Sequence, residues 1–314
     1  MRGTVVSGER RAAMARRGAM TEVRPKDSVL GDRRTIVVGI DGSEHSRLAV
    51  KWAADEAKLR DSVLRIVYAG TAEPAAVPAW YSSAPATMSA GQAVIDDAFA
   101  LVTTRHASVV LETDLPDSSP ARALIRASAV ADLVVVGARG HGGFKELLLG
   151  SVSQRTIQRA VCPVVVVRPV PDMINDAVAE PRIVVGIDGS SRSDRALRWA
   201  LREAELRSAS VEAIFACVIA PMTGFMNSAA AGYETAGRPI IEAAIAQAAE
   251  WQPDVPFSAV TLLDATVPAL LAAGDGAGLL VVGSSGHSSH RHIVLGSVAD
   301  QCTRHAGCAV AVVR

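Results

Sequence analysis

The sequence contains two copies of one long pattern, and this internal repeat constrains the fold more than any other feature. Residues 35–60, TIVVGIDGSEHSRLAVKWAADEAKLR, align with residues 182–207, RIVVGIDGSSRSDRALRWALREAELR. Residues 133–153 align in the same way with residues 279–299. Both segments contain two glycines separated by two residues, and both contain LGSV further on. Because the matches occur near the start and toward the end of each copy, the repeat covers a whole domain.

The repeat and its surroundings predict how the chain is divided. We expect one domain at 34–168 and a second at 182–314, joined by a proline-containing linker at 169–181. Residues 1–33 are rich in arginine and lack an apolar core, so we expect a disordered extension rather than a secretion signal. Met20 opens a more ordinary beginning, MTEVRPKD, so the start is left open between this methionine and the first residue.

Within each copy, short β-branched runs alternate with longer segments of helical period. This is the pattern of a parallel sheet covered by helices. We predict an α/β protein with two tandem Rossmann-like domains, each a five-stranded parallel sheet with helices on both faces. The expected strands are 35–40, 63–69, 108–113, 132–137 and 163–168 in the first copy, and 182–187, 211–217, 257–263, 279–283 and 308–313 in the second. The expected helices of the first copy are 45–60, 90–106, 120–130 and 151–160.

The first helix of each copy carries one apolar stripe at helical spacing. We expect the stripe to lie in the core, tryptophans included. Its residues are Ala49, Trp52, Ala53 and Ala57 in the first copy, and Ala196, Trp199, Ala200 and Ala204 in the second.

Composition narrows the classes of ligand and compartment. Lys plus Arg and Asp plus Glu both number 32, so no basic field indicates nucleic acid, and a small-molecule or protein ligand is favoured. No apolar run approaches the roughly 18 residues of a membrane span. The four cysteines are too few and too irregular for a disulfide framework, which favours a cytoplasmic location.

A glycine–serine spacing recurs after the fourth strand of each copy: Gly137-x2-Gly140-x9-Gly150-Ser151, and Gly283-x2-Gly286-x9-Gly296-Ser297. Glycines at the carboxyl end of a strand let the backbone approach an anion closely, and the start of the next helix favours negative charge. Ligands of doubly wound folds also lie beyond the carboxyl ends of the strands. We therefore predict a phosphate-binding loop. A Walker A loop fits poorly, because Lys145 follows Phe144 rather than glycine.

Two structural alternatives remain open for these residues. Ser151-x-x-Gln154 and Ser297-x-x-Asp300 resemble helix capping boxes, in which the serine requires no ligand. Asp41-Gly42-Ser43 and Asp188-Gly189-Ser190 follow the first strand of each copy, and they could form a turn and a helix cap rather than contact ribose or adenine. Their recurrence beside the same expected pocket favours binding.

The VVGIDGS and G-x2-G-x9-G-S motifs of both copies resemble those of the universal stress proteins, in the tandem two-domain form common in actinobacteria, from about residue 34 to 314. Resemblance to the ATP-binding branch implies ATP as ligand, with Mg2+ held by its phosphates. It implies adenosine contacts from Gly39, Asp41, Gly186 and Asp188. It implies ribose and phosphate contacts from Gly137, Ala138, Arg139, Gly140, His141, Gly142, Gly143, Gly150 and Ser151, and from Gly283, Ser284, Ser285, Gly286, His287, Ser288, Ser289, Gly296, Ser297 and Val298.

The two copies differ within this loop. Ser285, Ser288 and Ser289 replace an arginine and two glycines of the first copy, which removes a charge and some backbone freedom, so we predict weaker or altered binding in the second copy. The family resemblance also implies that the last strands, in PVVVVR and AVAVVR, pair within the chain. A homodimer of the whole chain and an unidentified protein partner are further expectations.

The expected function is that of a nucleotide-dependent regulator of stress or growth state, acting through a change of conformation or interface. One alternative is a slow ATPase, for which His141 and His287 are the only candidate catalysts. Another is a nucleotide-free interaction scaffold. A metal site at Cys302-x2-His305-x2-Cys308 is less favoured, because no fourth ligand is evident. The irregular stretches 70–91 and 218–237 are expected to be long loops. Their large apolar residues are expected to pack loosely on the surface of their own domain, with a lid or a partner surface as the less favoured alternative; these residues are Trp80, Tyr81, Phe225 and Met226.

Overall fold

Five parallel strands form the sheet of the first copy in the order β3-β2-β1-β4-β5. The computed structural model describes residues 34–68, 84–116, 118–140, 148–169, 181–218, 226–286 and 295–314, with no side chains described in 84–90 and 226–236. The elements of the first copy are β1 (Thr35–Ile40), α2 (Glu44–Leu59), β2 (Val63–Tyr68), α3 (Ala84–Arg105), β3 (Leu111–Asp114), α4 (Pro120–Ala127), β4 (Leu133–Gly137), α5 (Ser151–Arg159) and β5 (Val164–Val167).

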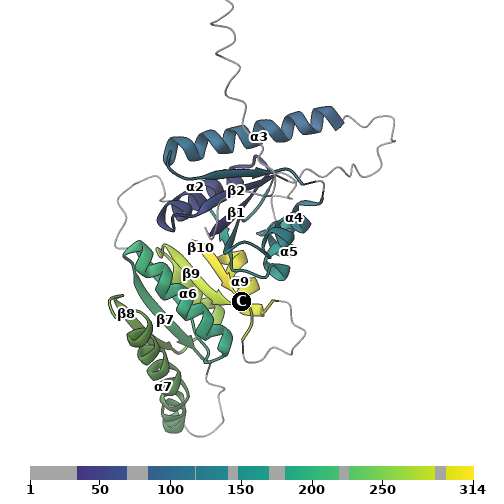
Figure 1. Cartoon of the computed structure of the whole chain (residues 1–314). Coiled ribbons are helices and arrows are strands. Elements are labelled where there is room, and N and C mark those ends of the chain that lie inside the picture. Colours follow the sequence, from purple (N-terminus) through teal and green to yellow (C-terminus); the bar gives the residue numbers. More distant parts are fainter. Residues whose placement is uncertain are drawn as a thin grey trace, which may run out of the picture. The chain divides into compact units, whose positions relative to one another are not determined.

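The second copy repeats this arrangement, with parallel strands in the order β10-β9-β6-β7-β8 (Figure 1). The predicted fold class, two tandem α/β domains with five-stranded sheets, is therefore confirmed. Its elements are β6 (Arg182–Gly186), α6 (Ser191–Arg207), β7 (Ser210–Ala216), α7 (Met226–Trp251), β8 (Phe257–Leu262), α8 (Thr266–Gly274), β9 (Leu279–Gly283), α9 (Ser297–His305) and β10 (Ala309–Val313).

The last strands of the two copies join the two sheets into one sheet of ten strands. β5 and β10 run antiparallel, with Val166 opposite Val310 and Val164 opposite Val312. Both strands are fully buried and apolar, so each covers an edge that would otherwise expose unpaired backbone groups. The pairing expected for the last strands is present.

Two long helices begin earlier than the sequence pattern indicated. α3 begins at Ala84 and α7 at Met226, inside the two stretches that we expected to be loops. That expectation was wrong for their later parts, where alanine and methionine, which favour helix, are mixed with proline, serine, threonine and glycine, which do not, and no apolar stripe is visible. Trp80, Tyr81 and Phe225 lie outside the described residues, as does the side chain of Met226.

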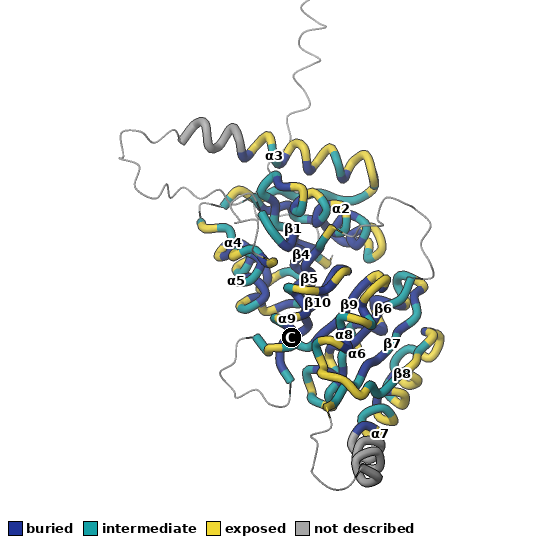
Figure 2. The backbone as a smooth tube through the Cα atoms, turned by 180° about the vertical axis from the view of Figure 1, so that it is seen from behind, coloured by how far each residue is buried: buried dark blue, intermediate teal, exposed yellow. Residues whose placement is uncertain are grey.

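Helices cover both faces of the sheet because alternate strand residues point to opposite sides. On β1, Ile36 and Val38 belong to one buried cluster, which includes α2 and α6, and Val37 belongs to the other, which includes α5 and α9. The buried central strands are dark blue in Figure 2. The alanines of the predicted stripe on α2 and α6 are buried, whereas Trp52 and Trp199 are only partly buried against the core.

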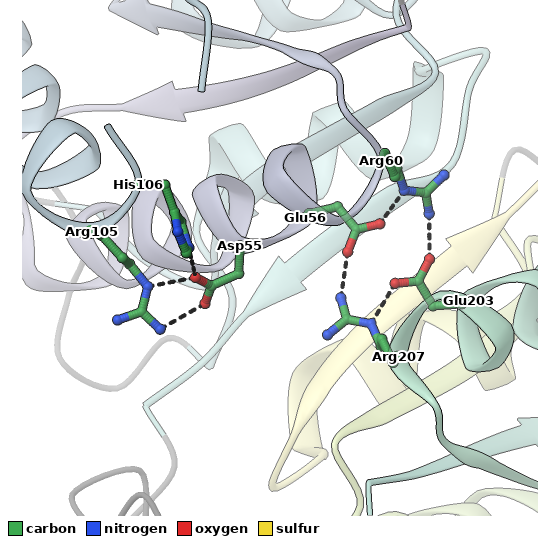
Figure 3. A network of polar contacts seen from close by, with 7 residues as sticks. All are labelled: Asp55, Glu56, Arg60, Arg105, His106, Glu203 and Arg207. Atoms are coloured by element: carbon green, nitrogen blue, oxygen red, sulfur yellow. Dashed lines mark hydrogen bonds and ion pairs between the residues drawn. The ribbon is translucent and has the colours of Figure 1, made fainter. Parts of the chain in front are cut away.

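A ring of four charged side chains links α2 of the first copy to α6 of the second (Figure 3). Arg60 donates hydrogen bonds to Glu56 and to Glu203, and Arg207 does the same. Both glutamates are fully buried. The guanidinium of Arg60 lies 5.9 Å from the ring centre of Trp199, and that of Arg207 lies 5.0 Å from the ring centre of Trp52. Each arginine therefore stacks on a tryptophan of the other copy.

The ring shifts the acidity of its two carboxyl groups in opposite directions. Burial, and after it the neighbouring Glu203, raises the pKa of Glu56 to about 7. Burial also acts to raise the pKa of Glu203, but Arg207 and Arg60 outweigh it, so that the pKa of Glu203 is lowered. The ring therefore favours protonation of one of its two carboxyl groups and ionisation of the other.

Candidate functional site

The turn after the first strand of each copy uses an aspartate to hold the start of the next helix. Asp41 Oδ1 accepts a hydrogen bond from the Ser43 N–H at 2.9 Å, and Ser43 Oγ caps α2 by accepting the Ser46 N–H at 3.2 Å. Gly42 between them has φ 87°, a left-handed conformation that suits glycine. Asp188, Gly189 and Ser190 repeat this geometry in the second copy. The turn-and-cap alternative is therefore correct for one oxygen of each aspartate.

The other carboxylate oxygen of each aspartate points at the glycine-rich loop. A Cβ atom added to Gly140 would lie 2.2 Å from Asp41 Oδ2, and one added to Gly286 would lie 2.4 Å from Asp188 Oδ2. At such distances the carboxylate would have to move, so glycine at both positions lets the aspartate keep this orientation. The ends of β1 and β4, and of β6 and β9, thus bring the two sequence motifs of each copy into contact.

Four other glycines of the predicted site have packing reasons of their own. A Cβ on Gly137 would lie 2.7 Å from the His45 carbonyl, and one on Gly39 would lie 2.8 Å from Leu124 Cδ1. The equivalent atoms of the second copy are crowded less, at 3.2 Å for Gly283 and 3.0 Å for Gly186. These glycines let α2 and α4, or α6 and α8, approach the strand ends closely.

The serines of the second motif do not cap their helices. Gly150 and Gly296 are the N-cap residues of α5 and α9, neither helix has a side-chain cap, and Ser151 and Ser297 are exposed first residues of the helix. The capping-box alternative is therefore wrong. The first N–H groups of an α-helix have no intrahelical acceptor, so these two helix starts can offer donors to an anion.

The backbone at Ala138 and Ser284 is already engaged. The Ala138 N–H donates to the Val167 carbonyl at 2.9 Å, and its carbonyl accepts the Gly150 N–H at 2.7 Å. The Ser284 N–H and carbonyl make the corresponding bonds, both at 2.7 Å. These two residues hold the helix start against the strand end, and their amides are not available as donors to a ligand.

A cavity of about 820 Å³ lies at the strand ends of the second copy. Such a volume is in the range of small-molecule and cofactor sites. Eight residues predicted from the sequence line it, namely Gly186, Asp188, Gly283, Ser285, Gly286, Gly296, Ser297 and Val298. The structure therefore brings most of the predicted second-copy residues together around one space.

Some wall residues were missed by sequence reasoning. Thr266 and Leu270 come from α8, and Gln154 and Gln158 come from α5 of the first copy. The α8 residues follow no motif, and the glutamines belong to the other copy, so no local pattern could identify them. Asp300 also lines the cavity, and Arg304 neutralises it through bonds of 2.9 and 3.2 Å.

In the first copy, the loop arginine is paired with a histidine from α2. Arg139 Nε donates to His45 Nε2 at 3.2 Å. Burial, and then Arg139, lowers the pKa of His45 below its ordinary value of 6.5, which keeps the imidazole neutral and able to accept this bond. In the second copy, Ser285 stands at the place of Arg139, and Arg192 stands at the place of His45.

Six predicted residues cannot be placed. His141, Gly142, Gly143, His287, Ser288 and Ser289 lie outside the described residues. Cys302, His305 and Cys308 are described, and no cluster of three or more metal-ligating side chains occurs in the part of the chain that the structure describes.

The fold and the site together define a tandem α/β protein with a ligand-sized pocket at the strand ends. The chain belongs to the universal stress protein family, whose sequence model matches residues 32–168 and 181–314. Universal stress protein Rv2623 of Mycobacterium tuberculosis is 30% identical over 291 residues, which cover 89% of this chain and 96% of that protein. Universal stress protein Rv2005c of the same organism is 32% identical over 295 residues, with the same coverage.

Among solved structures, a universal stress protein from Archaeoglobus fulgidus covers 90% of this chain and 99% of its own, with a TM-score of 0.68 and 20% identity. This match concerns the tandem fold alone. None of the described helices is both long and apolar enough to cross a membrane.

Proposed function

We propose that this universal stress protein binds ATP at the strand ends of both copies and acts in the cytoplasm as a nucleotide-dependent regulator of stress or growth state. The observation that carries the proposal is the cavity of about 820 Å³, because eight residues chosen from sequence motifs line it. An ordinary surface hollow would have no reason to collect Asp188 of the Asp-Gly-Ser turn together with the Gly-x2-Gly-x9-Gly-Ser residues of the same copy.

The residues present fit a nucleotide. Gly186, Asp188 and Leu270 form one part of the wall, where a carboxylate beside an apolar surface suits a nucleoside. Gly286 and the uncapped start of α9 at Gly296 form another part, where close backbone approach and free helix donors suit phosphates. Mg2+ held by these phosphates would offset their remaining charge.

In the first copy, the same roles fall to the equivalent residues, and we propose them as its ATP site. They are Gly39, Asp41, Gly137, Arg139, Gly140, Gly150 and Ser151, with His141, Gly142 and Gly143 in the loop. Occupancy of the two sites is proposed to shift a conformation or an interface, including that of a homodimer or of an unidentified protein partner.

The test is nucleotide stoichiometry measured on the full chain. We expect the purified protein to release ATP on denaturation, and the nucleotide-free protein to bind two MgATP per chain by isothermal titration calorimetry. Asp41→Ala and Asp188→Ala should each remove one site, whereas Asp254→Ala, a change at an exposed turn residue, should remove none.

The alternatives give different results in the same experiment. Steady conversion of bound ATP to ADP, lost on replacement of His141 or His287, would establish the slow ATPase instead. A protein that neither retains nor binds nucleotide would be a scaffold, and the proposal would be wrong.

A further inference from the structure

Reciprocal contacts hold the last helix of each copy against the other copy. Arg168, which follows β5, donates to the Thr303 carbonyl of α9, and Arg314, which follows β10, donates to the Ile157 carbonyl of α5. Thr303 and Ile157 occupy equivalent positions in the repeat. The exchange therefore has the two-fold character of an isologous interface.

This exchange places α5 of the first copy beside the pocket of the second. Gln154 and Gln158 are four residues apart, so they lie on one face of α5, and both line the cavity of the second copy together with the first turn of α9. Each glutamine is partly buried. The wall of that pocket is thus built from both copies.

The same short helix also begins in the first site. Ser151 opens α5 next to the predicted phosphate loop of the first copy, and Gln158 is seven residues further on, about 10 Å along the helix. One rigid element of nine residues therefore reaches from the first site to the wall of the second.

We infer that Gln154 and Gln158 hold the anionic part of the nucleotide bound in the second copy, so that this ligand bridges the two copies. A glutamine side chain offers two N–H donors without a charge, and these two share a cavity with the uncapped N-terminus of α9, where phosphates are best stabilised. This inference rests on the proposed ATP site, and it assigns part of that site to the neighbouring domain.

The inference makes the second site sensitive to changes in a helix that belongs to the first copy. Because α5 contacts both sites, a shift of α5 that accompanies binding in one copy changes the wall of the other pocket. The two sites are then coupled through α5, and this coupling requires no movement of the sheet.

The test uses the full chain with Asp41→Ala, so that only the second site is measured. In this background, the pair Gln154→Glu and Gln158→Glu should weaken MgATP binding about tenfold, because two carboxylates would face the phosphates. The pair Gln154→Lys and Gln158→Lys should keep or strengthen binding. Gln301→Glu, an exposed glutamine of α9 that does not line the cavity, is the matched control and should change affinity by less than about twofold.

Unfolding midpoints show whether each variant keeps its fold, and only folded variants are compared. If the glutamate pair and the Gln301→Glu control bind MgATP with equal affinity, the inference is wrong. It is also wrong if the glutamate and lysine pairs lose the same amount of affinity, because the glutamines would then act only through their shape. An Asp41→Ala chain that binds one ATP while the glutamines prove neutral leaves the proposed function intact. A wild-type chain that binds none refutes both.

Discussion

Replacing Arg60 with methionine should destabilise the chain far more than the same change at Arg65. Arg60 reaches two glutamates whose side chains are fully buried, and its own side chain is 11% exposed. Arg65 pairs with Glu112 at 2.7 Å, and both side chains are about one-third exposed. Methionine keeps most of the apolar stem at each position, so the comparison isolates the charge.

The expected magnitudes follow from burial. Removing one partner of a buried ion pair costs about 3 kcal/mol or more, and here it would leave two buried carboxyl groups with Arg207 as their remaining partner in the ring. A partly exposed pair contributes at most about 1 kcal/mol. For a chain of this length, 1 kcal/mol lowers the melting temperature by roughly 2 °C. We therefore expect a loss of about 6 °C for Arg60→Met and about 2 °C or less for Arg65→Met, measured by calorimetry and by urea denaturation.

The pH dependence of this loss provides a second check on its cause. Without Arg60, the two carboxylates of the ring share one arginine, so their pKa values rise and protonation relieves the penalty at low pH. The loss of stability should be smaller at pH 5 than at pH 8. Equal melting temperatures for the two variants, or an Arg60→Met penalty that does not change with pH, would refute the reasoning.

Three further predictions follow from other sites. Gly140→Ala should lower ATP affinity in the first copy because its Cβ must displace Asp41 Oδ2, while Gly307→Ala, whose nearest neighbour would lie 3.7 Å away, should leave titrations of ATP unchanged. The pKa of Glu56 is raised in the folded state from 4.5 to about 7, so its contribution to stability is present below pH 4.5 and is lost as pH rises through 7. Glu56→Gln should therefore remove this decrease in the free energy of unfolding, measured by urea denaturation at several pH values. Burial raises the pKa of the Cys162, Cys302 and Cys308 thiols to about 11 or 12. A thiol reagent at pH 8 should therefore label the partly exposed Cys217 first, and faster labelling of any of the three buried thiols would contradict this.

Local patterns were sufficient for the strands but not for the charged ring. Runs such as LVVVG and VVVV are short, β-branched and apolar, and they form β4 and β5 where expected. Glu56 lies in a helix rich in charge and Arg60 caps its end, so their i, i+4 spacing indicates an exposed pair. Their burial arises only when α6 of the second copy packs against α2. The signal that could have revealed them is the identity of the two copies at these positions, because the second copy has Glu203 and Arg207 there.

The difference between the two loops also changes meaning once the copies are compared in space. The sequence shows that Arg139 is replaced by Ser285, which predicts a lost charge. In the structure, however, Gly137 packs against His45 and Gly283 packs against Arg192, so the histidine and this arginine occupy the same place at the start of α2 and α6. Besides the arginine that follows its last strand, each copy therefore has an arginine beside the strand-end glycine, on the loop in the first copy and on the helix in the second. Because Arg192 belongs to a helix and Arg139 to the loop, the two sites should differ in where this charge is held more than in their net charge.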